Sequence, residues 1–520
     1  MQQILERYQP LIIIGCILCA FLFRLWLISD NHVLFLFDQS RDAFLSQQIL
    51  DQGKLKVQGP SASGTDNLLY HGVLYYYIIG PVYTLFDGNP FPVVVLLAFL
   101  SSLTIIPLFL LIKQFTNKSL FAAVFGSLLF AFSFEAGEMG IWLANSSFTL
   151  LTITTFYYFL WQVFFCGKSK QLPFVLLFLG LSNQMGIYTI YLWVSLIFAW
   201  IFSNSKEEKW KILKNIKLLL ISIGVYILSI STIVISEVLL VHNGVLQFED
   251  LTDFINQGHG SFFTTLNTIF NDYFNTVAST LIPNNMDISI IFYLIIGVLG
   301  YIFLSRAAKK FMAIWFLSPI FILLVQPNSA LQYTVCAALI IYILLSLVLV
   351  RVIRNRNAWK IAVVSIIGIF AFFNINEGVI ARNKNFQFFF PIQQGVMLNN
   401  ELAAIDFTYK KAGGSPFSIS TYTNPYGYDT TWAYLYNWYG RQRYGYVPSF
   451  FGPSQQGIFA GDLLPQVNNP LSMHFTIREP ISTGISHQFT IEQNIFAGSP
   501  SASMYFDKLT VRIRDSRVLK

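Results

Sequence analysis

Charged side chains are scarce in this chain of 520 residues: Asp, Glu, Lys and Arg together make up 11% of it, whereas 54% of its residues are hydrophobic. The mean hydropathy is +0.56. Many apolar runs are too long for a soluble surface and long enough to cross a bilayer. The composition therefore excludes an ordinary soluble protein and predicts a polytopic α-helical membrane protein.

Cysteine is also rare. The four cysteines, Cys16, Cys19, Cys166 and Cys336, lie in or at the edge of apolar runs. Cys16 and Cys19 have the spacing of a redox pair, but inside an apolar helix two small neighbours are the simpler interpretation. The tail after about residue 376 has none. We therefore expect the tail to fold without disulfides.

The apolar runs predict about eleven membrane-spanning helices. The first run is too long for the core of a signal peptide and little positive charge precedes it, so we expect it to be retained. Residues 172–202 divide at 182–186, which predicts a helical hairpin with Asn183 and Gln184 at its outer tip. The candidate spans are residues 11–28, 92–112, 120–134, 148–165, 172–181, 187–202, 216–241, 288–304, 311–325, 333–350 and 361–373.

The distribution of Lys and Arg predicts the orientation, because short positively charged loops resist translocation. The intervening external loops are nearly free of cations, apart from Arg41, Lys54 and Lys56. We expect a cytoplasmic N-terminus, a cytoplasmic (inner) membrane location and an external tail. The net charge of +7 then reflects topology, and no basic stripe indicates nucleic acid. Loops 113–118, 166–171, 204–217, 305–310 and 351–360 hold 2, 2, 5, 3 and 4 cations.

The chain divides into a membrane domain, residues 1–375, with an external loop at 30–90, and an external α/β domain, residues 376–520. The second is richer in Gly, Ser, Asn and Tyr. Its local patterns predict a small mixed domain. Helices are expected at 399–411 and 430–440, and strands at 417–421, 473–478, 488–493 and 509–514.

The external loop carries the residues of greatest chemical interest. Arg41 follows Asp38 by three positions, so the two side chains would be neighbours on a short interfacial helix. A carboxylate can take the proton from an acceptor hydroxyl, and a guanidinium can hold a departing phosphate through two oxygens. This pair suits glycosyl transfer from a phosphate-linked sugar. The alternative is an ordinary surface ion pair, which contributes about 0–1 kcal/mol.

Aromatic residues follow in the same loop. His71 and the tyrosines at 75–77 can be amphipathic anchors at the level of the lipid headgroups. They can also line a site beside Asp38.

Together these segments resemble the GT-C glycosyltransferases of the protein O-mannosyltransferase and aminoarabinose transferase type, which use polyprenyl-phosphate sugars. Asp38, Arg41 and Ala43 match the family's Asp-x-x-Arg-x-Ala segment. A second segment, His-Pro-Pro-Leu-Tyr in the family, is matched at His71 and at the Leu-Tyr pair that follows it. The resemblance implies that Asp38 is the catalytic base and that Arg41 and His71 lie near the donor phosphate. Further candidate acceptor or substrate contacts are Asp42, Tyr75, Glu135, Glu138, Asn145 and Gln184.

Two further stretches resemble the bacterial branch of the family, and the resemblance as a whole covers about residues 10–350. Residues 142–147 are similar to its Trp-x-x-Asn element, and residues 180–184 to its hairpin tip. The sequence departs from the family at Gln39, where many members have a second acid, and at 72–73, which replace paired prolines. A divalent cation is therefore an open question, and the first external loop has no Asp-x-Asp.

Three charged residues near the spans have alternative interpretations. Glu135 and Glu138 can bind an acceptor or a divalent ion, but a solvated helix end is the default interpretation. Arg24 lies in an apolar run, where a charge costs about 2.5–3.5 kcal/mol. We expect it to snorkel to the outer interface, with contact to a lipid phosphate as the alternative.

These observations predict an inverting glycosyltransferase that moves a sugar from a polyprenyl phosphate to a lipid, glycan or protein acceptor of the cell envelope. Its partners are the donor, the acceptor and membrane lipids. A transporter or flippase of lipid-linked glycans is the alternative, although it should carry ionisable groups along a central path. A membrane scaffold displaying the tail is a third interpretation, but it gives no reason for Asp38 and Arg41 to lie together.

Overall fold

The computed structural model describes most of the chain, and all statements below concern these residues. They are residues 6–60, 69–203, 206–242, 286–325, 335–352, 356–385, 395–452, 459–480 and 486–515, with single residues between 267 and 283.

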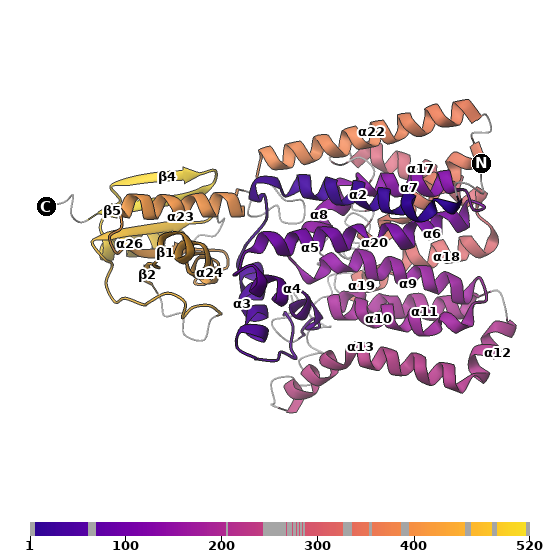
Figure 1. The fold of residues 1–520 in the computed structure, drawn as a ribbon, viewed down its shortest axis with the longest axis horizontal. Helices are drawn as coiled ribbons and strands as arrows, with labels where there is room; N and C mark the ends of the chain where they lie inside the picture. The colour runs from indigo at the N-terminus through magenta and orange to yellow at the C-terminus, as the bar shows by residue number, and fades with distance from the viewer. Residues whose placement is uncertain are drawn as a thin grey trace.

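A bundle of helices forms the larger part, and the polar tail forms a separate layer at one end of it (Figure 1). The N-terminus lies at the opposite end, with α13 and α22 along two outer edges. The helices are α2 (Gln9–Leu27), α3 (Phe37–Asp51), α4 (Leu74–Leu85), α5 (Pro90–Ser102), α6 (Ile105–Phe115), α7 (Leu120–Ala131), α8 (Phe134–Ile141), α9 (Thr149–Phe164), α10 (Leu172–Met185), α11 (Tyr191–Phe202), α12 (Lys206–Lys214), α13 (Ile216–His242), α17 (Met286–Phe303), α18 (Arg306–Leu317), α19 (Ile320–Val325), α20 (Val335–Ala338), α21 (Ile340–Val352) and α22 (Arg356–Asn383).

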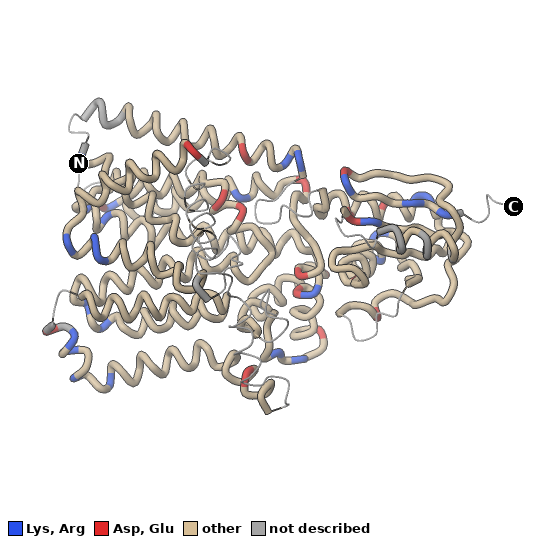
Figure 2. Tube along the Cα trace, turned by 180° about the vertical axis from the view of Figure 1, so that it is seen from behind, with Lys and Arg blue, Asp and Glu red and all other residues tan. Residues whose placement is uncertain are grey.

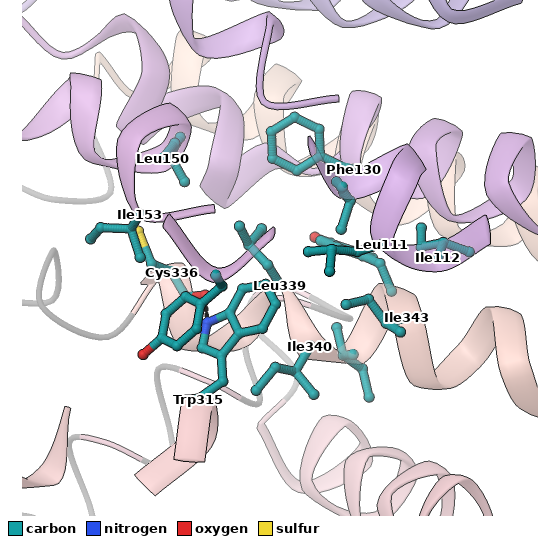
Figure 3. Close-up of a cluster of buried hydrophobic side chains, with 14 of the residues drawn as sticks. Leu111, Ile112, Phe130, Leu150, Ile153, Trp315, Cys336, Leu339, Ile340 and Ile343 are labelled. Atoms are coloured by element: carbon teal, nitrogen blue, oxygen red, sulfur yellow. Dashed lines mark hydrogen bonds between the residues drawn. The ribbon is translucent and has the colours of Figure 1, made fainter. Parts of the chain in front are cut away.

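Large aromatic side chains fill the centre of the bundle. Trp315 stacks on Tyr157, with ring centroids 4.3 Å apart, and its indole N–H donates to the carbonyl of Cys336 at 3.1 Å. Figure 3 shows Trp315 beside Cys336 and the aliphatic side chains that follow it in the chain. The buried indole therefore has the polar partner that it needs.

The structure contains fewer full-length spans than the eleven predicted. Within the described residues, four helical segments are long and apolar enough to cross a membrane: Gln9–Asn31, Pro90–Phe115, Ile216–His242 and Ile361–Asn383. A fifth is possible if α7 and α8, bent by 62°, count as one span. Apolar runs identify buried segments, but helix breaks and bends divide several of them into pieces too short to cross alone.

The hairpin at residues 172–202 has the expected break. Helix α10 ends at Met185, because Gly186 is extended, and α11 then runs back. The backbone N–H of Ile187 donates to His71 at one end of the pair, and the carbonyl of Phe202 accepts from Lys310 at the other.

Arg24 does not snorkel. Its side chain is fully buried. The guanidinium donates to Ser101 Oγ at 2.9 Å and to the carbonyls of Ala20 and Ala136 at 3.1 and 3.4 Å, and it lies 5.1 Å from the Phe130 ring centroid. Hydroxyl and carbonyl oxygens of α2, α5 and α8 thus take the place of water, so the predicted outer position is wrong.

The tail folds as a five-stranded mixed sheet with the order β2-β1-β3-β5-β4. β1 is parallel to β2 and β3, whereas β5 is antiparallel to β3 and β4. Its elements are α23 (Leu398–Ala412), β1 (Ser418–Tyr422), α24 (Thr430–Leu435), a π-helical turn (Tyr436–Gly440), α25 (Arg441–Tyr444), β2 (Ser449–Phe450), β3 (Met473–Arg478), α26 (Ser486–Ala497), β4 (Ala502–Phe506) and β5 (Leu509–Asp515).

Most of the predicted tail elements are confirmed, but residues 488–493 form part of helix α26 and not a strand. Alternating hydrophobic residues suggested the strand. In the structure Phe489 and Gln493, four positions apart, are both buried, which is the spacing of one helix face. β2 and β4 were not predicted. The boundary at 376 stays a prediction, and α22 continues across it to Asn383.

Lys and Arg gather at the end of the bundle where the N-terminus lies (Figure 2). We call this the basic end and define it by residues 113–118, 166–171 and 305–310. The tail is at the other end. This separation agrees with the predicted topology, although the orientation in a membrane stays a prediction.

Candidate active site

Helix α3, which carries Asp38 and Arg41, lies between the bundle and the tail (Figure 1). Gln39 holds its first turn in place. Its side-chain oxygen accepts from the N–H of Leu36 at 3.0 Å, and its amide nitrogen donates to the carbonyl of Leu143 at 3.2 Å. The first contact satisfies an N–H that a helix start leaves unpaired, and the second joins α3 to the bundle.

Arg41 bridges two carboxylates. Its Nη1 donates to Asp38 Oδ1 at 2.7 Å, while Nε and Nη2 donate to Asp42 Oδ1 at 2.9 and 2.8 Å. The exposed fraction of the Asp38 side chain is 52%, whereas that of Arg41 is 10% and that of Asp42 is 6%. The predicted pair is therefore a three-residue cluster in which only Asp38 faces solvent substantially.

Tyr76 completes this cluster and was missed as a site residue. Its hydroxyl donates to Asp42 Oδ1 at 3.0 Å. Its position in the run of tyrosines at 75–77 was the sequence feature that could have indicated a role in the site. The neighbouring Tyr75 is buried and packs edge-to-face on Phe148, with centroids 6.1 Å apart, so it supports the wall of the site.

Burial and charge act in opposite directions on this cluster. Burial tends to lower the pKa of Arg41, but Asp42 and Asp38 outweigh it and raise that pKa, so the guanidinium stays charged. Burial raises the pKa of Asp42 to about 6, and the neighbouring Arg41 opposes this rise. Asp42 thus titrates close to neutrality while it holds Arg41.

His71 lies near the cluster as a neutral imidazole. Its Nδ1 accepts from the N–H of Ile187 at 3.1 Å, which leaves the proton on Nε2. Burial, and secondarily the charge of Arg41, lowers the pKa of His71 to about 4. The side chain can therefore donate one neutral hydrogen bond, but it does not add a positive charge at pH 7.

Close backbone packing explains the Gly-Val pair that replaces the family's prolines. A Cβ on Gly72 would lie 1.9 Å from Gln184 Oε1 and 2.7 Å from the Cα of the same residue. Gln184 in turn donates to the carbonyl of Ser229 and to Thr232 Oγ1, both at 2.8 Å. The loop that carries His71 therefore packs closely on α10 at Gly72, where there is no room for a side chain.

Asn145 and the α8 glutamates lie outside the Arg41 cluster. Asn145 donates to the carbonyl of Met185 at 2.5 Å, which joins the turn before α9 to the end of α10. Glu135 and Glu138 are both buried, so their interpretation as a solvated helix end is wrong. Thr280 donates to Glu135 at 2.5 Å. A role of these residues toward an acceptor stays a prediction.

The described residues hold no group of three or more His, Cys, Asp or Glu that could bind a metal ion. Near Asp38 the second carboxylate, Asp42, already accepts three hydrogen bonds at Oδ1. The donor set around Asp38 does not fit a divalent cation, so we derive no step through a metal.

A pocket of about 440 Å³ lies beside the His71 loop, between α4, α10 and α13. Its walls are mostly aliphatic, and Gln184, Ser229 and Thr232 are at its polar part. Helix α13 is largely exposed along its length. The apolar lining residues include Val73, Leu74, Leu177, Leu181, Val225 and Leu228.

The tail packs directly against α3. Ser40 and Thr431 share a hydrogen bond of 3.2 Å, and the Phe37 and Tyr428 rings meet edge-to-face at 5.1 Å. Farther along, the Tyr434 hydroxyl donates to the carbonyl of Gly88 at 2.7 Å. The tail thus contacts residues on both sides of Asp38 in α3 and is part of its surroundings.

Comparison with known proteins agrees with this architecture. Residues 70–235 match the family of dolichyl-phosphate-mannose-protein mannosyltransferases. Crystal structures of ArnT from Cupriavidus metallidurans share the fold: the form bound to undecaprenyl phosphate has a TM-score of 0.58 at 11% identity, covering 96% of this chain and 97% of that one. The apo form has a TM-score of 0.59 at 10% identity, covering 99% of each chain. No curated protein matches the sequence.

Residues 70–235 thus match a glycosyltransferase family, in agreement with the sequence-based prediction. The chain as a whole has the fold seen in ArnT, with the tail included.

We predict that Gly72→Ala destabilises the protein by about 1–3 kcal/mol, because the added methyl group meets Gln184 in a closely packed contact. Gly15→Ala in α2 is the matched control, since nothing lies within 4 Å of its added Cβ. Thermal unfolding of both purified variants measures the difference. Equal unfolding midpoints would show that the His71 loop does not depend on this contact.

Proposed function

We propose that this protein transfers a sugar from a polyprenyl phosphate to an acceptor hydroxyl at the outer surface of the cytoplasmic membrane. One observation carries the proposal: a solvent-facing carboxylate, Asp38, is bonded at 2.7 Å to a buried guanidinium, Arg41, at the tail end of an apolar helical bundle. The match to polyprenyl-type mannosyltransferases over residues 70–235 supports it.

Asp38 acts as the general base in this proposal. Its side chain is 52% exposed and therefore accessible to an incoming hydroxyl. Proton removal accompanies attack of the acceptor oxygen on the anomeric carbon, and the bond to the phosphate oxygen breaks. Attack from the face opposite the phosphate inverts the anomeric configuration.

Arg41 stabilises the leaving phosphate. Charge develops on the phosphate oxygen as the glycosidic bond breaks, and a charged donor held in a water-poor site stabilises it strongly. Asp42 and Tyr76 keep the guanidinium in place, and His71 Nε2–H adds a neutral donor on the same side. The sugar and its phosphate would thus lie between Asp38 and the His71 loop.

The pocket between α4, α10 and α13 fits the beginning of the prenyl chain. Its aliphatic walls start beside Leu74, three residues after His71. An apolar chain leaving the phosphate would be shielded from water there. The ArnT structure bound to undecaprenyl phosphate supports a lipid phosphate as the ligand of this fold.

The tail contributes to the acceptor site through Tyr428. This side chain is 40% exposed and lies on Phe37, the residue that precedes Asp38. An aromatic ring at the edge of the site can pack against a sugar or lipid acceptor without touching the donor phosphate.

The flippase alternative gains some support from the buried charges, because Arg24, Glu135 and Glu138 lie inside the bundle. The enzyme accounts for more of the site, since a flippase has no use for a carboxylate that faces solvent beside a phosphate-binding guanidinium.

We predict that Asp38→Asn reduces sugar transfer by roughly a hundredfold or more, the scale of a lost general base, while donor binding remains. Purified protein is assayed with radiolabelled polyprenyl-phosphate sugars and a panel of lipid, glycan and peptide acceptors. Asp51→Asn, at the far end of α3, is the control and should keep full transfer. Full activity of the Asp38 variant would remove the mechanism.

The charge of Asp42 predicts a pH dependence of donor binding. Because its pKa is raised to about 6, Asp42 gains a proton between pH 7 and pH 5 and the site loses one negative charge. The polyprenyl-phosphate sugar is a phosphodiester and keeps one negative charge from pH 7 to pH 5. It should therefore bind more tightly at pH 5 by about 1 kcal/mol, roughly fivefold. In Asp42→Asn this step should be absent. A variant that keeps the wild-type pH profile would contradict the assignment.

Tyr428→Ala should raise the KM for the acceptor severalfold and leave the Kd for the donor unchanged, because only the acceptor side of Asp38 is altered. Tyr426→Ala is the matched control: it is 37% exposed in the same loop but packs on Tyr422 and Phe489. Equal effects of both substitutions, or a loss of donor binding with Tyr428→Ala, would refute the acceptor role.

A further inference from the structure

We propose a second ligand site at the opposite end of the bundle, where a pocket at the basic end binds the phosphate group of an anionic membrane lipid. The pocket has a volume of about 620 Å³ and lies among the N-terminus of α2, the end of α6 and the end of α9. It is separate from the sugar-transfer site and does not rest on the proposed function.

The pocket has an excess of positive charge. Lys113, Lys118 and Lys168 line it, and Glu6 is the only acidic residue in its lining. Lys113 donates one hydrogen bond to Gln9 Oε1 at 2.5 Å, which leaves two of its three N–H groups available. Three ammonium groups around one hollow attract an anion and favour a phosphate, which can accept several hydrogen bonds at once.

Buried polar groups in the same wall point to a ligand. Gln162 is 1% exposed, and neither its amide nitrogen nor its oxygen has a hydrogen-bond partner within the described part of the chain. The indole N–H of the adjacent Trp161, which is 8% exposed, is also without one there. Both residues line the pocket. Buried donors without partners are unfavourable, so a bound phosphate oxygen would satisfy groups that the protein itself leaves unpaired.

The position of the pocket favours a lipid over a soluble phosphate compound. Leu110 and Trp161 form its apolar side, continuous with α6 and α9. Lys113 lies in the last turn of α6, and Lys118 and Lys168 lie in the loops that follow α6 and α9. Tryptophan and lysine together mark the level of the headgroups in a bilayer. A lipid phosphate at this level can meet the lysines while its acyl chains stay beside the apolar helices.

Native mass spectrometry of the full-length protein tests the site. The protein is exchanged from detergent with phosphatidylglycerol, with phosphatidylcholine or with inorganic phosphate alone. We expect one phosphatidylglycerol to be retained preferentially. Retention should fall about fivefold for each lysine removed in Lys113→Gln/Lys168→Gln, the scale of a lysine next to an anionic lipid surface. Lys214→Gln/Lys309→Gln, which removes the same charge outside the pocket, should retain lipid like the wild type.

Gln162→Leu separates binding from packing. If the amide contacts the lipid phosphate, this variant loses phosphatidylglycerol retention although its thermal unfolding midpoint without lipid is unchanged or higher. If Gln162 is only a poorly paired core residue, the midpoint rises and lipid retention stays at the wild-type level, which overturns the proposal. Equal retention of phosphatidylcholine, or binding of inorganic phosphate without any lipid preference, would overturn the assignment to an anionic lipid.

Discussion

The burial of the Arg41 guanidinium is the constraint on which the candidate active site depends. A charge taken out of water costs several kcal/mol unless carboxylates and further hydrogen bonds surround it. Asp42 and Asp38 accept hydrogen bonds from the guanidinium, and Tyr76 donates to Asp42, so α3 and α4 must keep one relative position. Thr431 of the tail contacts Ser40, which lies between Asp38 and Arg41, so the tail belongs to the same structural unit as the site.

This constraint also separates the roles of two neighbouring carboxylates. Asp42 is buried and accepts all of its hydrogen bonds from Arg41 and Tyr76, so it is a positioning residue. Asp38 meets only one nitrogen of the same guanidinium and keeps half of its surface in water. A base must be reachable by its substrate. The difference in exposure, more than the motif itself, favours Asp38 as the residue that contacts an acceptor.

Residue spacing and composition correctly predicted the features that depend on neighbouring residues in the chain. The three-residue spacing of Asp38 and Arg41 foretold their contact, and the composition foretold the apolar bundle. The wrong predictions concern tertiary contacts. Arg24 is buried because oxygen atoms of two other helices accept its hydrogen bonds. Glu135 and Glu138 are buried in the bundle because α8 bends away from α7. Residues 488–493 form part of a helix that packs against the sheet, although their alternating pattern indicated a strand. Hydropathy likewise cannot locate the bends that shorten the spans.

Gln39 illustrates how the departure from the family pattern fits the rest of this site. Its side chain both accepts from the N–H of Leu36 and donates to the carbonyl of Leu143. An ionised acid could make the first contact, but it has no proton for the second and would face the carbonyl oxygen with like charge. In this chain the position serves to hold α3 against the bundle. In the proposed mechanism the phosphate is then stabilised by Arg41, which Asp42 and Asp38 keep positively charged despite its burial.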